Sequence, residues 1–300
     1  MARVAKRIFK GKTYYYLEHT IRERDRRITK KKYLGDKLPK NIDSVKKKFL
    51  FEINKAKWFD DFERIRRNYN AELKSTPKSA REKEVREFSV RFTYDTQRIE
   101  GSTLTLRETA QLLENRISPS GRPTEDSKEA EAHQKVFLEM LELKRDLSQQ
   151  LIQDWNWKLL KETESDVAGR IRGHGVRITG SRFIPPSPVE LQPLLDEFFD
   201  WYSGNKAKAN PVELAGLVHL KFVTIHPFTD GNGRISRLMM NLVLHRHGYP
   251  MLNIEYKGRA TYYSSLERSQ LNEDERPFMN WFFRRYRREH GRFLTLLANR

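Results

Sequence analysis

The sequence predicts a mainly α-helical protein with a small β extension at its N-terminus. Two observations give this fold class. From residue 45 onward, apolar residues recur for the most part at the three- and four-residue spacing of amphipathic helices. Before residue 40, short tyrosine- and isoleucine-bearing runs are separated by glycine turns, a pattern typical of strands.

The N-terminal strand pattern covers Arg7 to Leu34 and indicates a small hairpin or a three-stranded unit. A long amphipathic helix is expected over residues 45–73. The run Ser75-Thr76-Pro77 then breaks the pattern. We therefore expect two parts, a basic extension over residues 1–78 and a helical domain over residues 79–300.

The helical domain is expected to contain nine helices and one exposed hairpin. The hairpin is predicted over Arg170 to Ile184, where β-branched residues alternate with glycines until Pro185-Pro186. A capping box is expected at Thr105 and Glu108. The predicted helices cover residues 79–99, about 105 onward, 127–146, 148–162, 187–203, 211–226, 232–247, 258–271 and 276–298.

Composition excludes several classes of protein. A hydrophobic content of 37% with 11% aromatic residues indicates a folded chain rather than a disordered one. The absence of cysteine excludes a disulfide framework, a thiolate nucleophile and a cysteine-ligated zinc site. The sequence has no apolar leader and no stretch long enough to span a bilayer. We expect a soluble, cytoplasmic protein with no membrane association.

The positive charge is concentrated near the N-terminus. The formal net charge is +18, and residues 1–40 hold fourteen Lys/Arg against four Asp/Glu. Together with Tyr14, Tyr15 and Tyr16, these cations could follow a phosphate backbone and stack on bases. The alternative is a solvated basic edge that prevents strand-to-strand aggregation. Both interpretations, nucleic-acid binding and edge protection, stay open.

The richest chemistry lies between residues 226 and 237. An apolar helical run from Leu214 to Ile225 ends at His226-Pro227, and a second run begins after Gly233. Backbone N–H groups at a helix start, next to glycines and arginines, form an anion site. The sequence therefore predicts a site for a polyphosphate beside a histidine.

Each residue of this loop has a chemical and a structural interpretation. His226 is a candidate base, since an unperturbed imidazole titrates near a pKa of about 6.5, or else a packed histidine. Asp230 is a candidate Mg²⁺ ligand or a helix N-cap. Arg234 and Arg237 are three residues apart, so they share one helix face. Asn232 is a candidate donor or a turn residue.

Together these residues match the pattern His-x-Phe-x-Asp/Glu-Gly-Asn-Gly-Arg-x-x-Arg at every position. The segment resembles the signature of the Fic (filamentation induced by cAMP) family, and the resemblance extends over about residues 80–290. It implies a Fic-type helical bundle with a β-hairpin flap. The flap, which would hold a target segment by strand-like pairing, corresponds to Val176, Arg177, Ile178 and Thr179.

The resemblance implies transfer of AMP from ATP to a Ser, Thr or Tyr hydroxyl of a protein target. His226 would act as the base, and Asp230 would hold Mg²⁺ against the phosphates. Phe228 would anchor the loop in the core. The nucleotide would be bound by Gly231, Asn232, Gly233, Arg234 and Arg237, with Tyr262 and Tyr263 bordering its base.

A second motif implies regulation. The segment from Thr96 to Gly101 matches the inhibitory pattern Ser/Thr-x-x-x-Glu-Gly/Asn of the same family. The resemblance implies that Glu100 pairs with Arg237 and leaves ATP in an unproductive pose. An autoinhibited protein adenylyltransferase is therefore expected, in which Thr96 and Glu100 belong to the inhibitory helix.

Several alternatives stay open at this point. The same site could remove AMP from modified targets or transfer another nucleotidyl or phosphoryl group. A nucleic-acid-binding regulator working through the basic N-terminus is a different class of function, and self-association is possible in any of them. A zinc hydrolase is disfavoured, because His219 and His226 have no further ligand at metal spacing. We expect His219 to be packed in the core.

Overall fold

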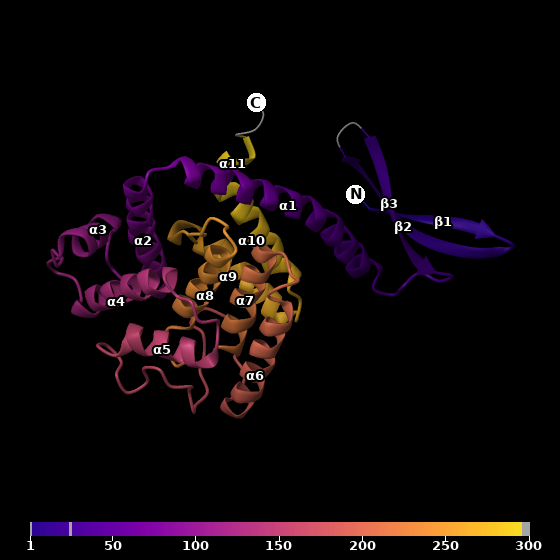
Figure 1. Ribbon diagram of the computed structural model, residues 1–300. Coiled ribbons are helices and arrows are strands. Elements are labelled where there is room, and N and C mark those ends of the chain that lie inside the picture. The colour runs from indigo at the N-terminus through magenta and orange to yellow at the C-terminus, as the bar shows by residue number, and fades with distance from the viewer. Residues whose placement is uncertain (1, 24–25, 296–300) are drawn as a thin grey trace. The chain divides into compact units, whose positions relative to one another are not determined.

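Figure 1 shows the computed structural model of the chain, which describes residues 2–23 and 26–295. The chain divides into two compact units, residues 1–63 and 64–300. The division falls inside the long helix α1 (Ile42–Ser75). The last turns of α1 belong to the second unit, where Asn68 and Asn70 donate hydrogen bonds to the carbonyls of Phe293 and Gly248. The domain boundary that the sequence predicts after residue 78 lies at the break after α1 and stays a prediction.

The first unit contains a three-stranded antiparallel sheet in the order β1 (Arg3–Phe9), β2 (Lys12–Glu23) and β3 (Arg26–Gly35). Lys10 and Gly11 both have positive φ, which gives the tight two-residue turn that favours the twist of a hairpin. On one side of the sheet Tyr33 packs against two tyrosines of β2, with ring centroids 6.2 and 5.3 Å away. The three-stranded unit expected from the sequence is confirmed.

The second unit is helical, and the mainly α fold class is confirmed. The predicted helices form, with ends that shift by a few residues. The last one is interrupted at His290-Gly291, and its expected end at residues 296–298 lies outside the described residues. The elements are α2 (Lys78–Glu100), α3 (Leu106–Asn115), α4 (Thr124–Leu141), α5 (Gln149–Leu160), α6 (Pro188–Asn205), α7 (Pro211–Ile225), α8 (Asn232–Arg246), η1 (Tyr256–Gly258), α9 (Arg259–Leu271), α10 (Arg276–Glu289) and α11 (Arg292–Thr295).

Local sequence explains where the helices begin. Thr105 and Glu108 form the predicted capping box, in which each side chain accepts from the backbone N–H of the other residue. Helix α7 begins with Asn210 as N-cap and Pro211 in its first turn. Among the described residues, no helix has an apolar segment of the length that a bilayer crossing requires.

Helices α7 and α8 form the centre of the second unit (Figure 1). Both are buried along almost their whole length, as expected for helices enclosed by others. Helices α6 and α10 contact α7, while α2, α4 and α5 contact α8. His219 of α7 is fully buried and lies 3.0 Å from the hydroxyl of Tyr262. The core position expected for His219 is confirmed, and the loop from 226 to 231 joins the two central helices.

The predicted hairpin over Arg170 to Ile184 is wrong. The segment contains only one isolated bridge, between Ile171 and Phe228, and otherwise consists of turns and irregular backbone. β-branched residues and glycines favour strands only where a second strand supplies hydrogen-bonding partners. Within this segment the structure gives no such partner strand, so the backbone is fixed instead by side chains from elsewhere.

Candidate active site

The loop between α7 and α8 is held in shape by Asn232. Its side-chain oxygen accepts from the Phe228 N–H at 2.9 Å, and its amide donates to the Phe228 carbonyl at 2.8 Å. Phe228 is fully buried, as expected for an anchor. Both polar atoms of the Asn232 side chain form hydrogen bonds inside the loop, so this side chain is part of the loop's scaffold. Its contribution to nucleotide binding stays a prediction.

Position 231 requires glycine for two reasons, its backbone conformation and the lack of space for a side chain. Its φ is +83°, and a Cβ there would lie 2.8 Å from Nδ2 of Asn156. Asn156, in the middle of α5, donates to the carbonyl of Asp230 at 2.9 Å and accepts from the Gly169 N–H at 2.8 Å. Sequence reasoning missed Asn156, since a lone asparagine within a helix carries no signal of a contact 74 residues away.

His226 has the geometry of a neutral base. It is the C-cap of α7 with φ of +53°, and its Nδ1 lies 3.2 Å from the Val223 carbonyl. Donation of Nδ1–H to that carbonyl leaves the lone pair of Nε2 available for a proton. Burial lowers the pKa of His226 below its usual value, and the contact with Val223 opposes this shift. The imidazole is therefore neutral near pH 7 and able to accept a proton.

Arg172 connects the loop at 170–186 to His226. Its guanidinium donates to the carbonyls of His226, His174 and Pro186 at 2.8, 2.8 and 2.7 Å. The side chain is buried, and in the described part of the chain it has no carboxylate partner. Burial accordingly lowers the pKa of Arg172. Sequence reasoning missed this residue, because one arginine in a basic chain has no distinguishing signal.

The flap residues Val176, Arg177, Ile178 and Thr179 lie in an irregular segment. Arg177 and Thr179 are exposed, while Val176 and Ile178 are half-buried. At the far end of the segment, Glu267 of α9 accepts from the Arg182 N–H at 2.7 Å. The segment is thus tied down at both ends, by Arg172 and by Glu267.

The two arginines of the motif are buried at the start of α8. Arg234 forms ion pairs with Asp230 and with Glu129 of α4. Arg237 forms an ion pair with Glu100, and its Nε donates to Oγ1 of Thr96 at 3.3 Å. Glu129 is 105 residues from Arg234 and was not predicted.

Glu100 lies against the N-terminus of α8. It is the last residue of α2, which ends at Gly101 with φ of +112°. Its carboxylate contacts Arg237 and lies against the Cα side of Gly233, where a Cβ would collide with it. Backbone N–H groups and the helix dipole favour an anion at this position. A carboxylate of the protein itself therefore lies at the helix start where the sequence predicts an anion site.

The two tyrosines expected beside the nucleotide base differ in exposure. Tyr262 is buried, and its hydroxyl lies 3.0 Å from Nε2 of His219, so it has a core position. Its predicted place beside the nucleotide base stays a prediction. Burial raises the pKa of Tyr262. Tyr263 is 44% exposed and donates to the Ile99 carbonyl at 2.8 Å. Only Tyr263 is accessible to a ligand.

Asp230 could bind Mg²⁺ only together with ligands from outside the protein, such as the phosphates of a nucleotide. The Asp230 side chain is 39% exposed, and one of its oxygens is paired with Arg234. Across the described ranges there is no cluster of three candidate metal ligands. A single accessible carboxylate suits Mg²⁺, which is usually bound by one or two carboxylates together with substrate phosphates.

Fold and site together define a class of protein: a helical domain that places a neutral histidine beside a buried, arginine-lined anion site. Residues 146–244 match the Fic/DOC family model. The resemblance inferred from the motif is confirmed by this match.

Similar proteins share the helical domain. Protein adenylyltransferase Fic of Drosophila willistoni is 34% identical over 192 residues, which cover 63% of this chain and 38% of that protein. Protein adenylyltransferase fic-1 of Caenorhabditis elegans is 34% identical over 203 residues, covering 66% and 39%. The chain therefore spans about two fifths of the length of these curated relatives.

Solved structures give the same result. A Fic-domain-containing signaling protein from Bacteroides thetaiotaomicron superimposes with a TM-score of 0.70 at 27% identity, covering 78% of this chain and 95% of that one. A fragment of Fic-1 from Caenorhabditis elegans has a TM-score of 0.70 at 28% identity, covering 85% and 77%. The Fic-type helical fold extends well beyond the segment that matches the family model.

Proposed function

We propose that this chain is an autoinhibited protein adenylyltransferase, which transfers AMP from ATP to a hydroxyl group of a protein target. The observation that carries the proposal is the pairing of buried Arg237 with Glu100 at an anion site beside neutral His226. The names of the similar proteins support the same activity.

In this proposal His226 Nε2 accepts the proton of the target hydroxyl. The hydroxyl oxygen then forms a bond to the α-phosphorus of ATP, and the bond from that phosphorus to the bridging oxygen breaks as pyrophosphate leaves. Arg237 and the N–H groups at the start of α8 bind phosphate oxygens where negative charge is concentrated. Mg²⁺, held by Asp230 and the phosphates, would neutralise part of that charge.

Glu100 is the inhibitor in this scheme. Its carboxylate pairs with the guanidinium of Arg237 and lies against Gly233 at the start of α8, two features that would otherwise bind phosphate. A triphosphate must displace it or bind in another pose. Removal of the carboxylate should therefore raise activity, although the substitution also removes a contact that stabilises the fold.

The test compares wild-type protein, Glu100→Gly and the double variant Glu100→Gly/His226→Ala, each incubated with labelled ATP and Mg²⁺. We expect Glu100→Gly to increase self-labelling at least about tenfold, since loss of a competing buried ion pair is worth more than about 1.4 kcal/mol. The double variant should be unlabelled. Intact mass should increase by one AMP group for each modified site.

Glu142→Gly is the matched control, because Glu142 also stands at a helix C-terminus but is exposed. It should leave labelling at the wild-type level. Lack of labelling in Glu100→Gly under these conditions would contradict the proposal. Release of AMP from a modified protein, with no forward transfer, would instead favour the reverse reaction. Nucleic-acid binding by residues 1–40 and self-association stay predictions.

A further inference from the structure

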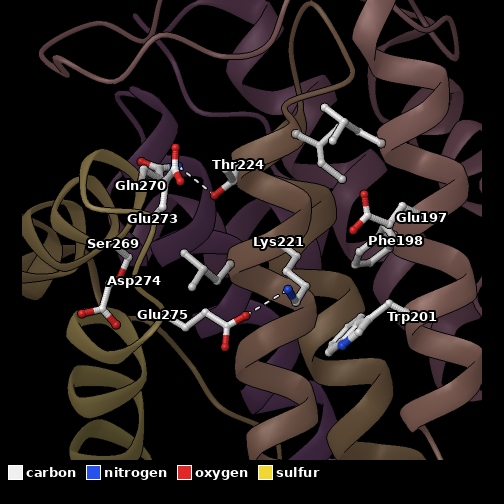
Figure 2. Close-up of a pocket in the computed structure, with 13 residues that line it drawn as sticks. Glu197, Phe198, Trp201, Lys221, Thr224, Ser269, Gln270, Glu273, Asp274 and Glu275 are labelled. Carbon is white, nitrogen blue, oxygen red and sulfur yellow. Dashed lines mark hydrogen bonds and ion pairs between the residues drawn. The ribbon is translucent and has the colours of Figure 1, made fainter. Parts of the chain in front are cut away.

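A groove lies on the flank of the helical domain, between α6, α7 and the junction of α9 with α10 (Figure 2). Its volume is about 300 Å³. Buried Phe198 and Leu220 form the floor, and partly exposed Leu194 and Trp201 form one wall. The groove is large enough for one or two apolar side chains.

The rim of the groove is acidic in a strongly basic chain. Four carboxylates line it, from Glu197, Glu273, Asp274 and Glu275. Lys221, the one lysine in the lining, lies 2.9 Å from Glu275 and packs its ammonium 4.9 Å from the centre of the Trp201 ring. The rim therefore attracts cations, whereas the chain as a whole has a formal charge of +18.

Helix capping explains only two of these acids. Asp274 accepts from the Arg276 N–H at 3.0 Å, and Asp274 and Glu275 directly precede α10, where negative charge is favourable. Glu273 follows the C-terminus of α9, where negative charge is unfavourable, and has φ of +48° where glycine is usual. Glu197 and Glu273 are exposed, and neither has an ion-pair partner among the residues described. These two carboxylates are available to a ligand.

The groove adjoins the candidate active site. Thr224 and Ile225, which line it, directly precede His226 in the chain. Gln270, also in the lining, donates to Oγ1 of Thr224 at 3.3 Å (Figure 2). Glu267, one helical turn before Gln270 on α9, holds the end of the flap segment at Arg182. A protein segment that presents a hydroxyl to His226 would pass beside this groove.

We propose that the groove binds a segment of the protein target in which a bulky apolar side chain is flanked by lysine or arginine. The apolar side chain would pack against Leu194 and Trp201, and the cations would pair with Glu197 and Glu273. The proposal rests on the proposed function, because it takes the occupant to be the substrate of the same site. It specifies the kind of sequence that surrounds a modified hydroxyl.

The first test measures binding without transfer. Fluorescently labelled twelve-residue peptides carry a central Phe flanked by Arg and Lys, the same Phe flanked by Glu, or Ala in place of Phe, and none contains Ser, Thr or Tyr. Fluorescence anisotropy is recorded with wild-type protein and with Glu197→Lys/Glu273→Lys. The matched control is Glu114→Lys/Glu142→Lys, which changes two exposed glutamates outside the groove and gives the same net charge.

We expect the basic Phe peptide to bind wild-type and control protein and to bind the groove variant at least about tenfold more weakly, as for loss of two close charge pairs. The acidic and Ala peptides should bind weakly to all three proteins. Glu197→Gln/Glu273→Gln should give an intermediate loss, and circular dichroism should confirm that each variant is folded. Equal binding to groove variant and control, or tighter binding of the acidic peptide, would overturn the proposal.

A second arm separates the groove from the activity. In the Glu100→Gly background, a serine placed beside the basic Phe motif should be modified with a KM that rises at least about tenfold on Glu197→Lys/Glu273→Lys, while self-labelling is unchanged. If no peptide is modified but the binding pattern holds, the proposed function fails and the groove's preference stands. Light scattering that shows dimers lost only in the groove variant would assign the groove to a second copy and refute the target proposal.

Discussion

At the scale of single residues, His226 and Arg237 have opposite requirements. His226 must be neutral to accept a proton, and burial provides this by lowering its pKa. Arg237 must stay charged, and Glu100 compensates for the cost of burying it. Removal of Glu100 alone is therefore expected to open an anion site and to leave the His226 imidazole neutral.

We predict that the pH dependence of kcat/KM in Glu100→Gly has its acidic midpoint below pH 6.5. Because burial lowers the pKa of His226, the imidazole stays neutral, and activity persists, until the pH falls below its ordinary titration range. Loss of Glu100 acts in the same direction, since this carboxylate raises the pKa of His226. A rate profile from pH 4.5 to 8 checks this, and a midpoint above pH 7 would contradict it.

Glu129 and Asp230 show how one arginine of the motif is positioned. Burial raises the pKa of Glu129, while the attraction of Arg234 opposes the shift. Two carboxylates hold the Arg234 guanidinium, one from Glu129 of α4 and one from Asp230 in the loop before α8. It is therefore fixed in the core, whereas Asp230 keeps an exposed edge.

At the scale of elements, the loop from 170 to 186 depends on Arg172. This side chain makes three hydrogen bonds to carbonyls, including that of His226, and the Arg172 N–H donates to the Pro227 carbonyl at 3.0 Å. The loop thus has few backbone bonds of its own and is held by two side chains, Arg172 near its start and Glu267 at its far end. Elements held in this way open locally at low free energy.

We predict that Arg172→Ala increases amide hydrogen exchange across residues 173–185 at least about tenfold. The substitution removes three hydrogen bonds to carbonyls, and each hydrogen bond contributes roughly 1 kcal/mol. Exchange measured by mass spectrometry checks this. Arg177→Ala is the control, since Arg177 is exposed in the same segment, and its exchange should match wild type. Equal amide exchange in the two variants would show that Arg172 does not stabilise this loop.

At the scale of the whole molecule, three buried histidines make the helical domain sensitive to acid. Burial lowers the pKa values of His133, His219 and His290 to about 3. They belong to α4, α7 and the end of α10, so the effect spans the domain. Each is neutral in the folded state at pH values where the unfolded chain binds a proton.

We predict that the free energy of unfolding is greatest above pH 6.5 and falls as the pH decreases from 6.5 toward 3, by up to about 4 kcal/mol per pH unit for three groups. Urea unfolding at pH 7.5, 6 and 5 measures this. His133→Gln should reduce the slope by about a third, while His245→Gln, at an exposed position, should leave it unchanged. Equal stability at pH 7.5 and 5 would refute the prediction.

The sequence was informative where the functional groups are close along the chain. The segment from His226 to Arg237 contains the end of one helix and the start of the next. The rules for helix ends therefore predict where its glycines and arginines lie. The hairpin over 170–184 was wrong because strand-forming residues need a partner strand, and local pattern does not supply one. The motif gives no sign that the hydroxyl of Tyr262 contacts His219, a histidine 43 residues away.

The sequence by itself determined the helical fold class, and it predicted the anion site at the start of α8 and its candidate base, because each depends on residues within a few helical turns. Only the tertiary structure decided which distant groups complete the site. Glu129, Asn156 and Arg172 reach the loop from other elements, and Glu100 meets Arg237 across 137 residues. Contacts of this kind are fixed by helix packing, which a local pattern of side chains does not specify.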